Sequence, residues 1–136
     1  MPREEVAATY NLWDLNLHAT GGEGFGLCIS EGMSSGLPTL ATDYTTSKEL
    51  IIDGNPSPRG SLLKVSELYW DKLDVAAVRR SLVDIDDFVK VLNKYYYNKD
   101  LVEDHGKNAR EWTEKNLAWK IIQKKWKNQV DDILSN

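Results

Sequence analysis

The chain has 136 residues, of which 41% are hydrophobic, a balance that indicates one globular domain with a core of its own. A formal net charge of -4 argues against nucleic acid as a partner, because binding a phosphate backbone requires a basic face. The single cysteine, Cys28, excludes an internal disulfide, and no apolar run is long enough to cross a membrane. We therefore expect a soluble, cytoplasmic protein, and the spacing of its histidines and cysteine predicts no metal site.

The first twenty residues predict a helix followed by a strand. Pro2 and the acidic residues after it are typical of a helix start, and apolar residues recur at helical spacing over residues 3–12. Residues 14–20 then alternate between apolar and polar, which predicts a strand. The apolar side of this strand consists of Leu15, Leu17 and Ala19, and the polar side of Asn16, His18 and Thr20.

The stretch from Thr20 to Pro38 carries the main functional signal. Clustered glycines lead into an apolar run that is closed by Gly36, and this order predicts a loop feeding a helix. The loop follows the expected strand at its carboxyl end, where ligands bind in open α/β sheets. Bare amides at a helix N-terminus favour an anion such as phosphate. Glu23 in the loop and Glu31 about two turns down the helix would suit the hydroxyls of a sugar or ribose.

Two more strands follow the helix. Residues 39–42 read as a buried parallel strand, and residues 61–65 as a further strand. Thr46 and Glu49 have the spacing of a capping box, so we expect a short helix from Ser47. The turn-rich loop that ends this helix is marked by Asp53, Gly54, Pro56, Pro58 and Gly60. The repeated order of strand, loop and helix predicts a parallel sheet of about three strands.

The rest of the chain reads as mostly helical. Residues 67–83 give mixed signals, and we interpret them as extended or loop structure. Asp84 caps a clear helix, and a second helix spans residues 99–115 with its pattern interrupted at Gly106. A third helix, over residues 118–134, places on one face Trp119, Ile122, Trp126, Val130 and Ile133. Its lysines are better explained as a solvated face than as a membrane contact, so this half is interpreted as helical cover.

Several residues have simple structural interpretations. A dinucleotide-binding glycine pattern fails on spacing, because Leu27 and Ile29 stand where the third glycine is needed. Cys28 is interpreted as a small buried apolar residue, His18 as a satisfied structural histidine, and Glu49 as part of a helix cap.

The ordered set of motifs resembles a known family. The motifs are Glu23-Gly24-Phe25-Gly26-Leu27, Glu31-Gly32-Met33, Gly36-Leu37-Pro38, Ala41-Thr42-Asp43 and Glu49-Leu50-Ile51, with Tyr10 and Asp14 upstream and Asp53-Gly54, Asn108-Ala109-Arg110 and Trp119 downstream. Together they resemble the C-terminal, donor-binding domain of retaining glycosyltransferases of the family 4 type. Those enzymes have the glycosyltransferase B fold, in which two Rossmann-like domains face one another across a cleft.

The resemblance implies an α/β fold, here an incomplete Rossmann-like domain, and a role for each site residue. Glu31 would hold the ribose of a nucleotide diphosphate sugar, and Glu23 would contact the transferred sugar as the catalytic residue. The amides of Gly24, Phe25, Gly26 and Leu27 would face the sugar and the diphosphate, where charge develops as the leaving group departs. The donor is the expected ligand, with neither a metal nor a further cofactor, and the carboxylates are not expected to act as the acid and base of a hydrolase.

Departures from the family pattern lead to expectations about the chain as a whole. The acceptor domain of such enzymes and a basic Arg and Lys pair for the diphosphate are not in residues 1–136, and Tyr44-Thr45-Thr46 stands where two glycines are usual. We expect a fragment that is inactive alone and that self-associates through an open sheet edge, with membrane contact only through a full-length enzyme. The alternatives are a nucleotide-sugar-binding module or partner subunit and, less favoured, an epimerase or phosphorylase of the same fold.

Overall fold

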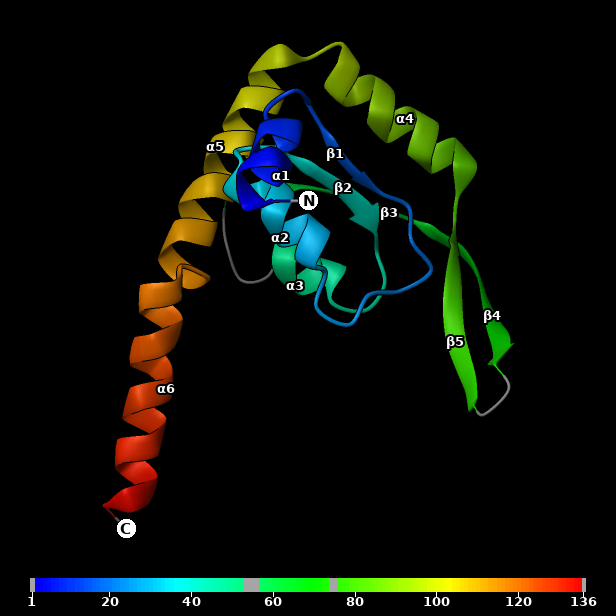
Figure 1. Ribbon diagram of the computed structural model, residues 1–136. Coiled ribbons are helices and arrows are strands. Elements are labelled where there is room, and N and C mark those ends of the chain that lie inside the picture. The colour runs from blue at the N-terminus through cyan, green and yellow to red at the C-terminus, as the bar shows by residue number, and fades with distance from the viewer. Residues whose placement is uncertain (1, 53–56, 74–75, 136) are drawn as a thin grey trace.

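A computed structural model describes residues 2–52, 57–73 and 76–135 and shows an α/β fold (Figure 1). The N-terminal part alternates helices and strands, and the C-terminal part is helical. The elements are α1 (Arg3–Tyr10), β1 (Asn16–His18), α2 (Leu27–Ser34), β2 (Thr39–Thr42), α3 (Ser47–Ile51), β3 (Gly60–Leu63), β4 (Val65–Leu73), β5 (Ala76–Val83), α4 (Ile85–Tyr96), α5 (Lys99–Asn116) and α6 (Trp119–Leu134). Within these residues no helix is long and apolar enough to span a membrane.

The three predicted strands form one parallel sheet in the order β1-β2-β3. The register pairs Leu17 with Leu40 and Ala41 with Leu62. All four residues of β2 are buried, as a central parallel strand requires. The fold prediction of a partial Rossmann-like domain with three parallel strands is thereby confirmed.

Helices cover both faces of this sheet. On one face Ala41 packs with residues of α2, α3 and α5, including Ile29, Met33 and Ile51. On the other face Leu40 and Leu63 pack with Tyr95 and further residues of α4 and α5. Figure 1 shows the sheet enclosed between these two sets of helices. The carboxyl ends of β1, β2 and β3 lie at one edge of the sheet, and the loops that follow these strands lie at that edge.

The predicted first strand is present as β1, and its buried residue comes from the polar side of the alternation. Asn16 is buried with only 2% of its surface exposed, whereas Leu17 is 45% exposed. Asn16 faces α2, where Gly32 leaves room for its side chain. Leu17 stays exposed because β1 is an edge strand of the described sheet.

Two details of the helix ends differ from expectation. The helix at Ser47 exists, but the capping-box interpretation is wrong, because Thr46 has helical backbone angles and makes no capping hydrogen bond with its side chain. Glu49 is exposed and is therefore not explained as a cap. The Asp84 cap is confirmed, since its Oδ1 accepts from the Asp87 amide at 2.9 Å. The expected turn at Asp53, Gly54 and Pro56 lies outside the described residues.

Within the stretch interpreted as extended or loop structure, residues 67–73 and 76–83 lie in a two-stranded antiparallel ribbon of β4 and β5. The ribbon begins at the carboxyl end of β3 and projects from the body of the molecule (Figure 1). The structure thus adds a second, separate sheet. The helix predicted over residues 99–115 is confirmed as α5, and at Gly106, where its pattern is interrupted, a Cβ would overlap the Gly36 carbonyl oxygen. Gly106 therefore permits close packing of α5 on the loop after α2.

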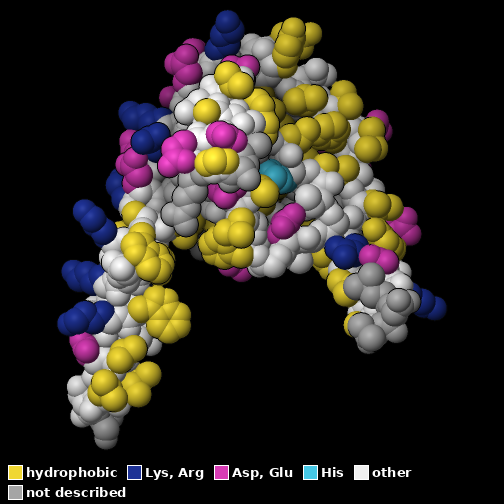
Figure 2. Space-filling model, viewed as in Figure 1, with side chains coloured by type: hydrophobic (Ala, Val, Ile, Leu, Met, Phe, Trp, Pro, Cys, Tyr) yellow, Lys and Arg dark blue, Asp and Glu magenta, His cyan; other side chains and the backbone are white. Residues whose placement is uncertain are grey.

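The last helix, α6, was expected to be cover, and this is wrong for the described structure. It has no buried residue, and Trp119, Trp126 and Ile133 are each about 70% exposed (71%, 69% and 72%). Figure 2 shows hydrophobic side chains along one side of the helix and lysines along the other. The amphipathic pattern predicted the helix correctly, because periodicity alone does not say what the apolar face contacts.

Candidate functional site

The Gly-rich loop connects β1 to α2 at the carboxyl edge of the sheet. It ends at Gly26, which precedes α2 with a φ of 81°, in the left-handed region that favours glycine. A Cβ at this position would also lie 3.1 Å from side-chain atoms of Ile29 and Leu50. Glycine at position 26 is therefore required for the chain to enter α2 in this direction. As a result, the first backbone amides of α2 lie at the sheet edge where ligands bind.

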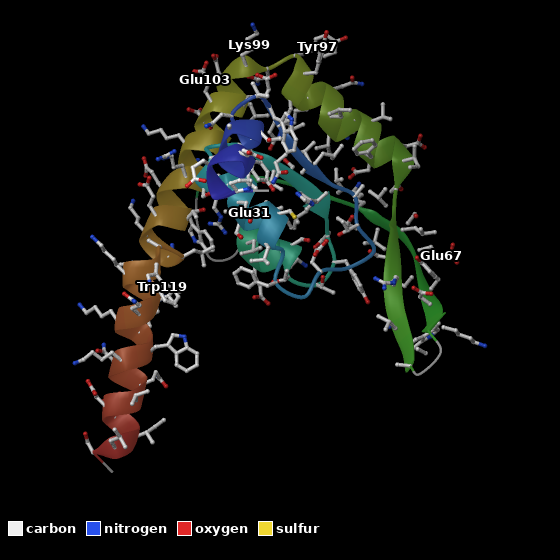
Figure 3. All side chains as sticks on the ribbon, in the orientation of Figure 1. Glu31, Glu67, Tyr97, Lys99, Glu103 and Trp119 are labelled. Carbon is white, nitrogen blue, oxygen red and sulfur yellow. The ribbon has the colours of Figure 1, made fainter. Side chains whose placement is uncertain are left out.

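Glu31 lies on the exposed side of α2, next to α1 (Figure 3). The hydroxyl of Tyr10 lies 3.2 Å from Glu31 Oε2 and 3.3 Å from the Cys28 carbonyl oxygen, so its one proton is shared between two acceptors. Burial raises the pKa of Tyr10, and the Cys28 and Glu31 side chains raise it further. Tyr10 therefore remains a hydrogen-bond donor to the carboxylate, and holds it in place.

Two hollows meet at Glu31. One, of about 360 Å³, lies between α1 and α2 and is lined by Val6, Tyr10, Glu31 and Ser35. The other, of about 450 Å³, lies between the start of α2 and the α5–α6 junction, and is lined by Phe25, Leu27, Glu31, Leu117 and Ile122. Glu31 is thus the carboxylate that both cavities share.

Glu23 lies in the loop and is half-buried. Its backbone N–H donates to Thr45 Oγ1 at 2.9 Å, and its charge acts on His18. Thr45 has a φ of 52°, a left-handed conformation that is strained for a β-branched residue. Glu23 lines neither of the two hollows that meet at Glu31. The structure therefore places both carboxylates on the segment from the loop to α2, and of the two only Glu31 lines these hollows.

The histidine next to the loop has a structural partner. His18 Nε2 lies 3.0 Å from Asn16 Oδ1, which accepts its proton. Burial lowers the pKa of His18, and the nearby charge of Glu23 opposes that shift. This arrangement agrees with the interpretation of His18 as a satisfied structural histidine.

Cys28 was expected to be buried, and this prediction is wrong because its side chain is exposed. Cys28 lies on α2 facing a hollow of about 530 Å³ beside β1, which is also lined by Trp13, Leu17 and His18. Because β1 is an edge strand of the described sheet, no further strand lies beside this hollow in the described residues.

Sequence reasoning missed three residues that hold the loop in place. Thr45 accepts from the Glu23 amide, the ring of Tyr44 lies 3.4 Å from the Cβ position of Gly22, and Ser81 of β5 donates its amide to the Gly21 carbonyl at 3.0 Å. The Tyr44-Thr45-Thr46 departure from the family pattern was a signal that contacts differ here. Nothing in the sequence spacing linked Ser81 to the loop.

The chemistry available at this edge is that of an anion and hydroxyl site. The amides at the start of α2 attract negative charge, and Glu31 accepts hydrogen bonds from hydroxyl groups. Among the residues that the structure describes, no group of three or more His, Cys, Asp or Glu side chains is placed to hold a metal ion.

Comparisons with known proteins place the chain in a family. Residues 1–74, which run from α1 into β4, match the family of glycosyl transferases group 1. The chain is 28% identical over 127 residues to sucrose synthase 6 of Arabidopsis thaliana, a match that covers 76% of this chain and 14% of that protein. It is 35% identical over 74 residues to sucrose synthase 5 of Oryza sativa subsp. japonica, covering 43% of this chain and 9% of that one. The matches therefore span a small part of these longer relatives.

Proposed function

The chain belongs to the group 1 glycosyl transferases, and from this we propose that it is the donor-binding part of a retaining enzyme of the family 4 type. In this proposal it corresponds to the C-terminal domain and binds a nucleotide diphosphate sugar whose sugar is transferred to an acceptor. The observation that carries the proposal is the position of Glu31 on α2, beside the glycine-led start of that helix and held by Tyr10.

Each part of the site takes one part of the donor. The Glu31 carboxylate accepts protons from the ribose hydroxyls, and each such charge-assisted bond is worth about 1.5–3 kcal/mol. The amides of Gly24 to Leu27 stabilise the diphosphate as it leaves. Glu23 contacts the transferred sugar, and its backbone is positioned for this role by Thr45.

Titration of nucleotide sugars, followed by calorimetry, tests the role of Glu31. Glu31→Ala should weaken the best-bound nucleotide sugar by about 1–3 kcal/mol, because the ribose loses its acceptor. Tyr10→Phe removes the hydroxyl that holds Glu31 but keeps the carboxylate, so it should have a smaller effect. Glu111→Ala, which removes an exposed carboxylate of α5, is the matched control and should bind normally. Equal affinity of wild type and Glu31→Ala would refute the ribose assignment.

We further propose that this chain binds donor but transfers no sugar alone, and that β1 associates with further polypeptide. The support is the edge position of β1, where Leu17 and Trp13 are 45% and 48% exposed beside a hollow. An open edge strand with apolar neighbours is a site for pairing. Light scattering at rising concentration should therefore show association that Leu17→Lys weakens. A clean monomer at high concentration would contradict pairing between copies and favour a different chain as the partner subunit.

A further inference from the structure

The β4–β5 ribbon is fastened to the Gly-rich loop at its base. The Ser81 amide donates to the Gly21 carbonyl at 3.0 Å, and the Tyr44 hydroxyl donates to the Arg79 carbonyl at 3.1 Å. Gly21 follows β1 and Tyr44 follows β2, while the ribbon itself follows β3. The carboxyl ends of all three parallel strands lie at one sheet edge, so the ribbon borders the edge where the donor is proposed to bind.

Arg80 is the basic residue at this junction. The aliphatic part of its side chain packs on the loop, since a Cβ at Gly21 would lie 3.3 Å from Arg80 Cδ. Its Nε donates to Asp71 Oδ2 across the ribbon at 2.8 Å. One third of the Arg80 side chain is exposed (34%), and the described residues offer no hydrogen-bond acceptor to its Nη atoms. Asp71 therefore orients the guanidinium through one nitrogen and leaves the other two available.

We propose that Arg80 binds an anionic group of the substrate held at the Gly-rich loop. Guanidinium N–H groups pair with the oxygens of a phosphate or a carboxylate, and an orientation already fixed by a partner reduces the entropy lost on binding. The α2 amides carry only partial charges, and a guanidinium packed on the loop that leads into α2 adds charged donors for the same anion. This inference rests on the proposed function and adds to it a residue from a separate sheet.

Two sources of the anionic group are distinguished by experiment. The diphosphate of the donor is probed with inorganic pyrophosphate and with UDP, GDP and ADP, and a sugar carboxylate is probed by comparing UDP-glucuronate with UDP-glucose. Arg80→Gln should weaken binding by about tenfold, because one charge-assisted interaction is lost. A loss for pyrophosphate and the nucleoside diphosphates assigns Arg80 to the diphosphate. A loss confined to UDP-glucuronate assigns it to an acidic sugar.

Arg79→Gln is the matched control. It makes the same change of charge on the same strand, but strand alternation places its side chain on the other face of the ribbon, so binding should not change. Hydrogen exchange of the Ser81 amide shows whether the ribbon is still docked in Arg80→Gln, because that amide is bonded to Gly21. With docking retained, equal binding of every probe to wild type and Arg80→Gln overturns the inference. Failure of wild type to bind any nucleoside diphosphate or UDP-sugar refutes the proposed function itself.

Discussion

Gly32→Ala tests whether close packing or helix propensity governs the helix that carries Glu31. Gly32 lies in the interior of α2, and its backbone faces the buried side chain of Asn16 in β1. A Cβ at position 32 would lie 2.6 Å from Asn16 Cγ, a separation that real Cβ atoms essentially never show. The Asn16 amide donates to the Cys28 carbonyl at 3.1 Å and to Thr39 Oγ1 at 3.2 Å. The added methyl group therefore forces this hydrogen-bonded side chain to move.

The competing free energies have opposite signs. Alanine in a helix interior is favoured over glycine by about 1 kcal/mol. Displacing Asn16 loses the two hydrogen bonds that its amide donates, worth about 0.5–1.5 kcal/mol each even if the bond from His18 is kept, and overpacking a filled site costs about 1–3 kcal/mol. The losses exceed the gain, so Gly32→Ala should lower the free energy of unfolding by about 1–5 kcal/mol.

Urea unfolding followed by circular dichroism measures this change, and a double-mutant cycle identifies its cause. Asn16→Ala is destabilising by itself, but it vacates the space that the new methyl group needs. In the Asn16→Ala background, Gly32→Ala should then be neutral or stabilising, which corresponds to a coupling of about 1–3 kcal/mol. If Gly32→Ala alone is as stable as wild type, the packing argument is wrong.

Three further outcomes follow from the structure. Burial and the neighbouring Lys94 lower the pKa of His105, so the folded state favours its neutral form. The free energy of unfolding, measured with urea, should therefore be highest above pH 6.5 and decrease as the pH drops below it, and the decrease should be smaller in His105→Gln. Thr45→Gly relieves a strained φ but removes the acceptor of the Glu23 amide, so the two effects should leave the free energy of unfolding within about 1 kcal/mol of wild type. Hydrogen exchange of the Glu23 amide should become faster, and unchanged exchange would contradict the contact. No described atom lies within 4 Å of the Cβ position of Gly24, so Gly24→Ala should unfold like wild type yet bind nucleotide sugars more weakly, and normal binding in calorimetry would place the donor elsewhere.

The parallel sheet and its helices could be predicted because each of them follows from local sequence. The strand at residues 39–42 is a short run bounded by Pro38 and Asp43, and the Asp84 helix combines a cap with a clear period. The β4–β5 ribbon could not be predicted in this way, because apolar side chains occur on both of its faces, as with Leu68, Tyr69 and Trp70. Such a sequence lacks the alternation of apolar and polar residues that identifies a strand. The two strands are held together by backbone pairing, which does not require this alternation.

The candidate site was predictable in its residues but not in their partners. Glu23 and Glu31 were identified from a local motif, and their roles in donor binding stay predictions. Their partners Thr45 and Tyr10 lie 22 and 21 residues away in sequence, on other elements. The exposure of Cys28 likewise depends on which edge of the sheet β1 occupies, and this is a property of the assembled fold.

The two ends of the ribbon meet where it leaves the body. Val65 is the register partner of Val83, and the Asp84 amide donates to the Lys64 carbonyl at 2.8 Å. A chain of one or two residues could therefore join Lys64 to Asp84 without moving β3 or α4, because paired strands lie only about 5 Å apart. The far end of the ribbon is thus a replaceable module, whose length and sequence can change while the sheet and its helices keep their places and the contacts of Arg79 and Ser81 with Tyr44 and the Gly-rich loop are retained. Substrate preference could change through such exchanges with little cost to folding.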